Sequence, residues 1–329
     1  MGLGTRLLGA VLALLMLSAC NHTDRMRGAN LLQSRTVLFE QEASGESIRR
    51  LHELGANTLA LVPFLQQSST DSVRMEPAGG MSEEGLRRVI RKAKSLQMRV
   101  VLKPQILVQG SWAGEIAPAD WDDWFTNYTV HLEQLARLAQ EEGVEMLVIG
   151  TELKQSIRQP QWLSLIKRLR EVYQGRLSYA AHGIEGLREV TFWRQIDAAG
   201  VTLYPPLGED SGQADEQIRA TLKTLRKTAR DLPAPLWVAE VGIASRSRAT
   251  RRPWAWQDLT HEEQEVDLQV QVHVLDLWLD ALSVSWLDGV LIWAWYSDPA
   301  AGGAGDNGFT PQNKPAEQVL ACHWSGRCQ

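Results

Sequence analysis

Short apolar runs alternate along the chain with longer segments whose apolar residues recur at helical spacing. The short runs have the length of buried strands, and the longer segments are typical of helices with one apolar face. The predicted strands cover residues 37–39, 57–62, 99–102, 144–149, 177–180, 198–202, 235–240 and 290–293. Eight strands alternating with helices predict an α/β fold, a single (β/α)₈ TIM barrel. An open doubly wound sheet is the alternative, but its GxGxxG and P-loop motifs are missing from this sequence.

Polar capping residues set the predicted helix starts. Ser44, Ser82 and Asp120 are placed to cap three helices, and Pro160 stands in the first turn of a fourth. The helix after Asp120 repeats aromatic residues at helical spacing, so these rings are expected in the core. A further long helix is expected over 262–282. Two long polar loops, 66–80 and 104–119, are left for function.

The N-terminus is typical of an export signal. Arg6 precedes an apolar stretch from Leu7 to Leu17 that is too short to span a bilayer comfortably. The next residues end in Cys20 and resemble a bacterial lipobox, which implies cleavage before Cys20 and a lipid on its thiol. We therefore expect a lipoprotein signal peptide (1–20), a tether (21–35) and a catalytic domain (36–329), anchored to the cell envelope. The outer membrane is favoured, facing the periplasm or the cell surface; an ordinary signal peptide is the alternative.

Cysteine usage agrees with export. Apart from Cys20, the chain has only Cys322 and Cys328, in the stretch CHWSGRC. An oxidising compartment favours a small disulfide loop between them. Metal binding with His323 is the alternative, although this spacing matches no common zinc pattern.

Composition narrows the possible functions. The net charge of −5 gives no reason to expect nucleic-acid binding. Thirteen tryptophans stand against five phenylalanines and five tyrosines. We expect most of the tryptophans in the core and about a quarter of them facing a cleft, where indole rings can stack on sugars. We expect a monomer.

Two strands end in a glutamate at corresponding places. The run before Glu152 and the run before Glu240 are both apolar, and carboxylates just past buried strands are poorly suited to packing. In a (β/α)₈ barrel the carboxyl ends of the strands form the active-site rim. The two glutamates would follow strands four and seven and face each other across it. A pair of carboxylates is what glycosidic-bond hydrolysis requires, although each could instead form an ion pair on the rim.

Other rim residues are candidates for substrate contact. Tyr204 could orient Glu240, and Lys103 could bind a sugar hydroxyl or pair with either glutamate. His182 could line the cleft or be satisfied by its own surroundings. Strict alternation places Trp293 and Trp295 on one side of the last strand. Trp295, nearer the rim, is the stronger candidate for the floor of the sugar site, and Trp112 is a second stacking candidate.

The chain resembles glycoside hydrolase family 113, a clan A (β/α)₈ family whose members are chiefly endo-β-1,4-mannanases. The similar stretches span nearly the whole mature chain in order: GANTLALVPF, VVLKPQI, WDDWFTNY, VIGTELKQS, RLSYAAHG, FWRQIDAAGVTLYPPL, PLWVAEVGI and VLIWAWYSD. The resemblance implies hydrolysis of a β-linked polysaccharide with retention. It also implies that Glu152 is the acid/base and Glu240 the nucleophile, with no metal or organic cofactor.

Two positions and one segment depart from the family pattern. Thr151 stands where clan A enzymes commonly carry an asparagine that binds the sugar 2-hydroxyl, and it is still expected to contact substrate. Ile243 replaces a frequent tyrosine. The segment Arg246 to Pro253 carries four arginines; it is either a solvated loop or a site for an anionic polymer.

Two other classes of function stay open. The first is a glycan-binding or cell-envelope lipoprotein without catalysis, which the presence of both carboxylates argues against. The second is a metal-dependent hydrolase, which would need several ligands at strand ends. Of the seven histidines only His182 follows a predicted strand, so the sequence predicts no metal site.

Overall fold

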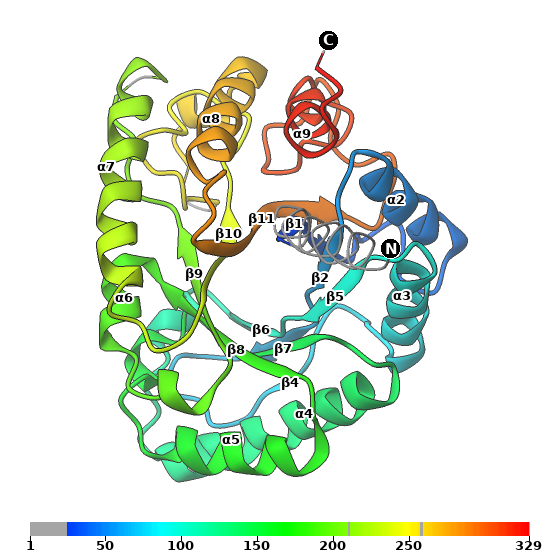
Figure 1. Ribbon diagram of the computed structural model, residues 1–329. Coiled ribbons are helices and arrows are strands. Elements are labelled where there is room, and N and C mark those ends of the chain that lie inside the picture. The colour runs from blue at the N-terminus through cyan, green and yellow to red at the C-terminus, as the bar shows by residue number, and fades with distance from the viewer. Residues whose placement is uncertain (1–24, 210, 257–258, 329) are drawn as a thin grey trace, which may run out of the picture.

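Eight parallel strands close into a barrel in a computed structural model that describes residues 25–209, 211–256 and 259–328 (Figure 1). In order around the barrel they are β1 (Met26–Leu32), β2 (Thr58–Leu61), β5 (Arg99–Leu102), β7 (Met146–Thr151), β8 (Arg176–His182), β9 (Ala198–Leu203), β10 (Leu236–Val241) and β11 (Leu287–Tyr296). The predicted single (β/α)₈ barrel is therefore confirmed. The expected signal peptide and Cys20 lie outside the described residues.

The first strand is not where the sequence placed it. Residues 37–39 form no strand, and β1 instead occupies residues 26–32, inside the expected tether. The pattern was misleading because β1 contains Arg27 and Asn30. Asn30 is fully buried, and its side-chain amide donates to the carbonyl oxygens of Ala239 (2.9 Å) and Ile292 (3.0 Å). These bonds tie β1 to β10 and β11 and make the polar residue compatible with a buried strand.

Helices surround the barrel on all sides (Figure 1). They are α2 (Glu42–Glu53), α3 (Glu83–Ser95), α4 (Trp121–Glu141), α5 (Gln161–Val172), α6 (Gly183–Glu189), α7 (Ser211–Ala229), α8 (Leu268–Ala281) and α9 (Ala316–Ser325). Ser82 and Asp120 cap α3 and α4 as predicted. Two predicted starts are wrong. Ser44 lies within α2 and donates to the carbonyl of Phe39, and α8 begins only after its cap Asp267.

Tryptophans fill much of the core. Trp237 lies inside the barrel with small residues from neighbouring strands, and its indole N–H donates to the Ser178 hydroxyl at 2.9 Å. Trp124 and Trp162 are fully buried among the aromatic side chains of α4 and α5. The predicted core role of the α4 aromatics is confirmed, since a buried indole with a satisfied N–H packs without an unpaired polar group.

A small second sheet extends two of the barrel strands past the carboxyl end. It consists of β3 (Phe64–Gln67), β4 (Glu76–Pro77) and β6 (Gln105–Val108), with β3 and β6 parallel. The sequence predicted only loops here, because all three segments are short, β3 and β6 each follow a proline, and β4 contains one. The sheet fixes the segment that starts at Gln105 beside the barrel mouth.

The C-terminus is held by a covalent link. Cys322 and Cys328 form a disulfide across the end of α9. His323 lies between the two cysteines and contacts Asp276 of α8 at 2.8 Å. Over the residues that the structure describes, no helix combines the length and the apolar character needed to cross a membrane.

Candidate active site

Glu152 stands one residue past β7 with a left-handed backbone (φ 57°), while its N–H donates to the Ala180 carbonyl of β8. Such a conformation in a residue other than glycine is held in place by its surroundings and is frequent at functional sites. Glu152 Oε1 lies 2.5 Å from Thr202 Oγ1 and 3.0 Å from His182 Nδ1. Its Oε2 accepts from the Trp112 indole N–H at 2.9 Å. Both carboxyl oxygens are thus engaged.

These partners decide the ionisation of Glu152. Burial raises its pKa, but the hydrogen bond and charge of His182, with the bonds from Thr202 and Trp112, outweigh burial and leave the pKa below its ordinary value. The Trp112 ring also packs against the His182 ring, with centroids 4.7 Å apart. Trp112 and His182 therefore contact each other as well as Glu152, and each helps to hold the other in place.

Glu240 lies on β10 and is buried with three donors. Its Oε1 is 2.5 Å from Lys103 Nζ and 2.5 Å from Gln105 Nε2, and its Oε2 accepts from the Tyr204 hydroxyl at 3.2 Å. Lys103 is completely buried, so the ion pair is largely shielded from water. Three hydrogen-bond donors directed at one carboxyl group stabilise its ionised form.

Burial works against both charges of this pair. It raises the pKa of Glu240, as does the nearby Glu152, while the Lys103 ammonium and the hydrogen bonds from Lys103 and Tyr204 oppose the rise. It lowers the pKa of Lys103, against the attraction of Glu240. Burial also raises the pKa of Tyr204, which stays protonated and keeps its hydroxyl as a donor. Perturbed carboxyl groups of this kind gather at catalytic sites.

Strand register brings the two carboxylates to one rim. His182 of β8 pairs with Thr202 of β9, and Thr202 pairs with Glu240 of β10. The Thr202 hydroxyl then reaches Glu152. The rim therefore carries two glutamates in mutual electrostatic contact, flanked by a lysine, a tyrosine and a histidine. Over the described ranges, no group of three or more His, Cys, Asp or Glu side chains could hold a metal ion.

The family profile described as Glycoside Hydrolase Family 113 matches residues 31–314. This match covers most of the chain and both carboxylates. The chain belongs to glycoside hydrolase family 113. It is accordingly a glycoside hydrolase. No curated protein shows significant sequence similarity to it.

Solved structures of family 113 enzymes share the fold. The complex of a GH113 β-1,4-mannanase superposes with a TM-score of 0.82 and 23% identity, over 93% of this chain and 100% of that chain. The GH113 β-mannanase AaManA from Alicyclobacillus acidocaldarius, in complex with ManMIm, gives 0.81 and 23%, over 94% and 99%. A family 5 mannosidase from Rhizomucor miehei gives 0.60 and 14%, over 92% of each chain. At these identities the likeness shows the fold alone.

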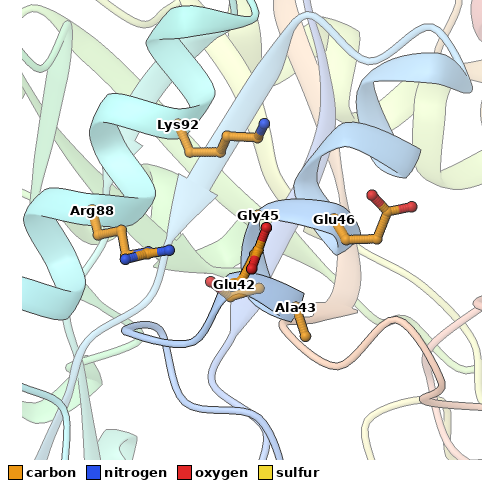
Figure 2. Close-up of a pocket in the computed structure, with 7 residues that line it drawn as sticks. Glu42, Ala43, Gly45, Glu46, Arg88 and Lys92 are labelled. Carbon is orange, nitrogen blue, oxygen red and sulfur yellow. The ribbon is translucent and has the colours of Figure 1, made fainter.

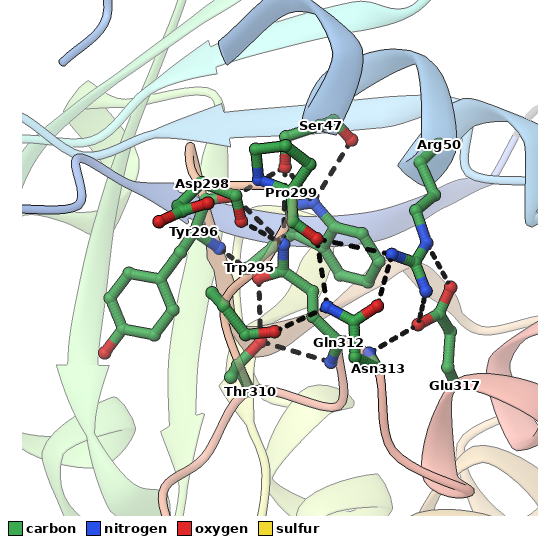
Figure 3. A network of polar contacts seen from close by, with 11 residues as sticks. Ser47, Arg50, Trp295, Tyr296, Asp298, Pro299, Thr310, Gln312, Asn313 and Glu317 are labelled. Carbon is green, nitrogen blue, oxygen red and sulfur yellow. Dashed lines mark hydrogen bonds and ion pairs between the residues drawn. The ribbon is translucent and has the colours of Figure 1, made fainter. Parts of the chain in front are cut away.

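The last strand presents a different tryptophan from the one expected. Trp295 is fully buried, and its indole N–H donates to Ser47 of α2 at 2.9 Å, within a polar network at the carboxyl end of β11 (Figure 3). The prediction that Trp295 floors the sugar site is therefore wrong. The register of β11 against β1 shifts between Ile292 and Trp295, so strict alternation fails there. Trp293 is half-buried at the mouth, with its ring 5.1 Å from Lys103 Nζ.

The remaining predicted site residues lie where the sequence placed them, Trp112 in its loop and the others at the carboxyl ends of their strands. Lys103 and Tyr204 contact Glu240, and His182 and Trp112 contact Glu152, as given above. Thr151 is buried, and its hydroxyl has no hydrogen-bond partner among the residues described. This hydroxyl lies next to the acid/base candidate, but its oxygen is covered by protein, so a ligand could reach it only if neighbouring side chains moved.

Two contacts were missed from the sequence. Gln105 follows the Lys103-Pro104 pair, and that polar residue just past a strand end was the available signal. Thr202 was taken as the last residue of a strand, and nothing in its neighbourhood distinguishes it from a structural threonine. Its role depends on register, which the sequence does not state.

The four arginines of the segment 246–253 form ion pairs or hydrogen bonds with other residues of the protein. Arg248 pairs with Glu262, Arg251 with Glu209, and Arg252 with Glu263 at 2.6 Å. Arg246 is buried and donates to a backbone carbonyl. The Arg252 hydrogen bonds lower the pKa of Glu263 to about 2. Three of the four arginines are thus already paired with glutamates and the fourth is buried, which argues against a free cationic surface for an anionic polymer.

A hollow elsewhere on the surface is unrelated to this rim. It measures about 540 Å³ and lies between the first turns of α2 and one side of α3 (Figure 2). Glu42 and Glu46 line it from α2, and Arg88 and Lys92 from α3. Glu46 is already paired with Arg49. None of the described residues that line the hollow contacts Glu152 or Glu240, so it has no direct part in the chemistry proposed for them.

Proposed function

We propose that this family 113 member is a retaining endo-β-1,4-mannanase in which Glu240 is the nucleophile and Glu152 the acid/base. The substrate class is supported by the solved family 113 structures, two of which are described as β-1,4-mannanases and one as a β-mannanase. The single observation that carries the roles is the buried Lys103 ammonium on Glu240, since the partners of Glu152 are His182, Thr202 and Trp112. A carboxyl group that accepts from a buried ammonium, an amide and a phenol is suited to act as an anion.

The reaction would proceed in two displacements. Glu240 attacks the anomeric carbon while Glu152 gives its proton to the departing glycosidic oxygen, which leaves a glycosyl ester on Glu240. Glu152, now a carboxylate, then takes a proton from the water that breaks the ester. This restores both groups and gives net retention of configuration.

The surrounding residues have matching tasks. Lys103, Gln105 and Tyr204 keep the nucleophile charged and oriented. Thr202, His182 and Trp112 stabilise Glu152 when it has lost its proton, which is its state after the first displacement. Trp293 offers a ring face at the mouth next to Lys103, and Thr151 carries an unpaired but buried hydroxyl beside Glu152, which a sugar could reach after a small movement of its neighbours. These two are the proposed sugar contacts.

The test is hydrolysis of β-1,4-mannan, glucomannan and xylan by the full chain and by Glu152→Gln and Glu240→Gln. We expect activity on the mannans, loss of it in Glu240→Gln, and a fall of about 10²–10⁴-fold in Glu152→Gln. Glu133→Gln, which alters a surface ion pair with Arg168, is the matched control. Full activity in Glu240→Gln would refute the nucleophile assignment.

Azide distinguishes the two roles. With an activated aryl β-mannoside, Glu240→Ala in azide should yield the α-mannosyl azide, because azide then attacks the sugar directly. Glu152→Ala should yield the β-mannosyl azide, because azide then replaces water in the second step. The reverse pattern would exchange the two roles.

We also propose that the protein is a lipoprotein anchored through Cys20. The lipobox-like sequence that ends at Cys20 supports this. Labelling cells with a radioactive fatty acid should mark the protein, and Cys20→Ser should remove the label and release the chain from the membrane fraction. A label that persists in Cys20→Ser would exclude the anchor.

A further inference from the structure

Two tryptophans stand out from the surface. Trp254 is 47% exposed and Trp256 is 63% exposed, whereas the other tryptophans are buried or half-buried. Ala255, between them, is buried. The backbone therefore directs one small side chain inward and presents two indole rings to solvent. Large aromatic side chains exposed in this way are unfavourable in water and are characteristic of binding surfaces.

The backbone that carries the two rings is fixed by hydrogen bonds to buried groups of the same loop. The buried Arg246 guanidinium donates to the Ala255 carbonyl at 2.5 Å, and the Ala255 N–H donates to the Arg252 carbonyl at 3.0 Å. Arg252 is itself clamped by Glu263 at 2.6 Å. The arginine-rich loop thus fixes the display of the two tryptophans. A pre-ordered pair loses little conformational entropy when it binds a ligand.

The two rings belong to the same side of the barrel as the catalytic glutamates. Their loop follows β10, the strand that carries Glu240. It is tied to the segment after β9, since the Leu207 N–H donates to the Thr250 carbonyl at 2.8 Å and Arg251 pairs with Glu209. That segment begins with Tyr204, the hydrogen-bond partner of Glu240. The tryptophan pair is therefore continuous with the catalytic rim through residues that are fixed to one another.

We propose that Trp254 and Trp256 form a second binding platform for a neutral polysaccharide, separate from the place where the bond is cleaved. Indole faces pack against the C–H faces of pyranose rings, and two rings two residues apart suit a polymer better than a single sugar. A neutral chain is favoured because the arginines of the loop are already engaged by glutamates or by the backbone. The identity of the polymer, a β-1,4-mannan, rests on the proposed function.

The test separates binding from catalysis. In the full chain carrying Glu240→Gln, the double change Trp254→Ala and Trp256→Ala should weaken retention on insoluble β-1,4-mannan by about tenfold or more. In the active chain the same change should raise KM for the polymer and leave kcat/KM for mannotriose unaltered. Leu163→Ala removes a similarly exposed apolar side chain from α5 and should alter neither. Equal melting temperatures would show that the fold is kept.

Two possible results would overturn the proposal, and a third would support it while refuting the mannanase function. Unchanged mannan retention in the double variant overturns it and leaves the proposed hydrolase function standing. Unchanged mannan retention together with lost binding to phosphatidylglycerol vesicles also overturns it and assigns the pair to a lipid surface. A parent chain that fails to hydrolyse mannan, yet retains it through these tryptophans, supports the platform and refutes the mannanase function.

Discussion

Thr202 connects the two catalytic candidates: its hydroxyl lies 2.5 Å from Glu152 Oε1, and its main chain is the register partner of Glu240. A shift of β9 against β10 would therefore change the position of one carboxylate relative to the other. The closed barrel opposes such a shift, because each strand is bonded on both sides. The geometry of the acid/base is thus fixed by the strand next to the nucleophile.

Thr202→Val should extend activity to higher pH. The Thr202 hydroxyl contributes to the lowered pKa of Glu152, so its removal raises that pKa. The acid/base works in the protonated form, and activity falls as the pH rises through its pKa. The alkaline limb of the kcat/KM profile on mannan should therefore move to higher pH. Thr126→Val, an exposed change on α4, is the control. An unmoved limb would contradict the role given to Thr202.

Lys103→Met should shift the acid limb of the pH profile of activity. Lys103 opposes the raised pKa of Glu240, so its loss raises that pKa further. The nucleophile works ionised, and activity falls as the pH drops through its pKa, so the acid limb should move to higher pH.

Removing one partner of a buried pair should also destabilise the fold by about 3–5 kcal/mol at neutral pH. A pH profile and a urea titration test the two effects, and an unchanged acid limb would refute the first.

Gly114→Ala should disturb catalysis without touching a polar group. A Cβ at this position would lie 2.2 Å from Trp112 Cη2, so the ring must move and its N–H must leave Glu152. We expect kcat/KM to fall by about 10–100-fold. Gly45→Ala, whose Cβ would be no nearer than 3.5 Å to Lys92, is the matched control. Trp112→Phe should reproduce the loss of the hydrogen bond. Unaffected kinetics in Gly114→Ala would show that Trp112 does not position Glu152.

Gln312→Leu should reduce stability while leaving the rim chemistry in place. The buried Gln312 side chain accepts from the Tyr296 N–H at 2.6 Å and donates to the Asp298 carbonyl at 3.0 Å (Figure 3). A leucine leaves these backbone groups unpaired, which should cost about 2–4 kcal/mol in the free energy of unfolding. Gln217→Leu, on the exposed face of α7, should cost far less in the same denaturation experiment. Equal losses would mean that the network contributes little.

The sequence predicted the parts of the site that depend on strand ends. Glu152 and Glu240 follow apolar runs, and a barrel must bring such positions to one rim. The parts that depend on register or on local irregularity escaped prediction. Thr202 matters through its alignment with Glu240, and Trp295 turned out buried because β11 shifts its register at that point. Neither effect leaves a mark in the pattern of hydrophobic residues.

The first strand escaped for a related reason. A buried asparagine is unfavourable unless its side-chain amide finds acceptors, and here they are backbone carbonyls of β10 and β11, more than 200 residues away in sequence. The helix caps, by contrast, are local, and Ser82 and Asp120 were predicted from their immediate neighbours.

The early start of β1 also decides on which face of the barrel the proposed lipid anchor would lie. Met26 lies at the amino end of its strand, on the side of the barrel opposite the catalytic rim, and it is only six positions from Cys20 (26 − 20). Six residues reach at most about 20 Å when fully extended. A lipid on Cys20 would keep the amino end of β1 within that distance of the bilayer. The attachment point would then lie on the face of the barrel opposite the mouth, where it cannot block the approach of a polymer.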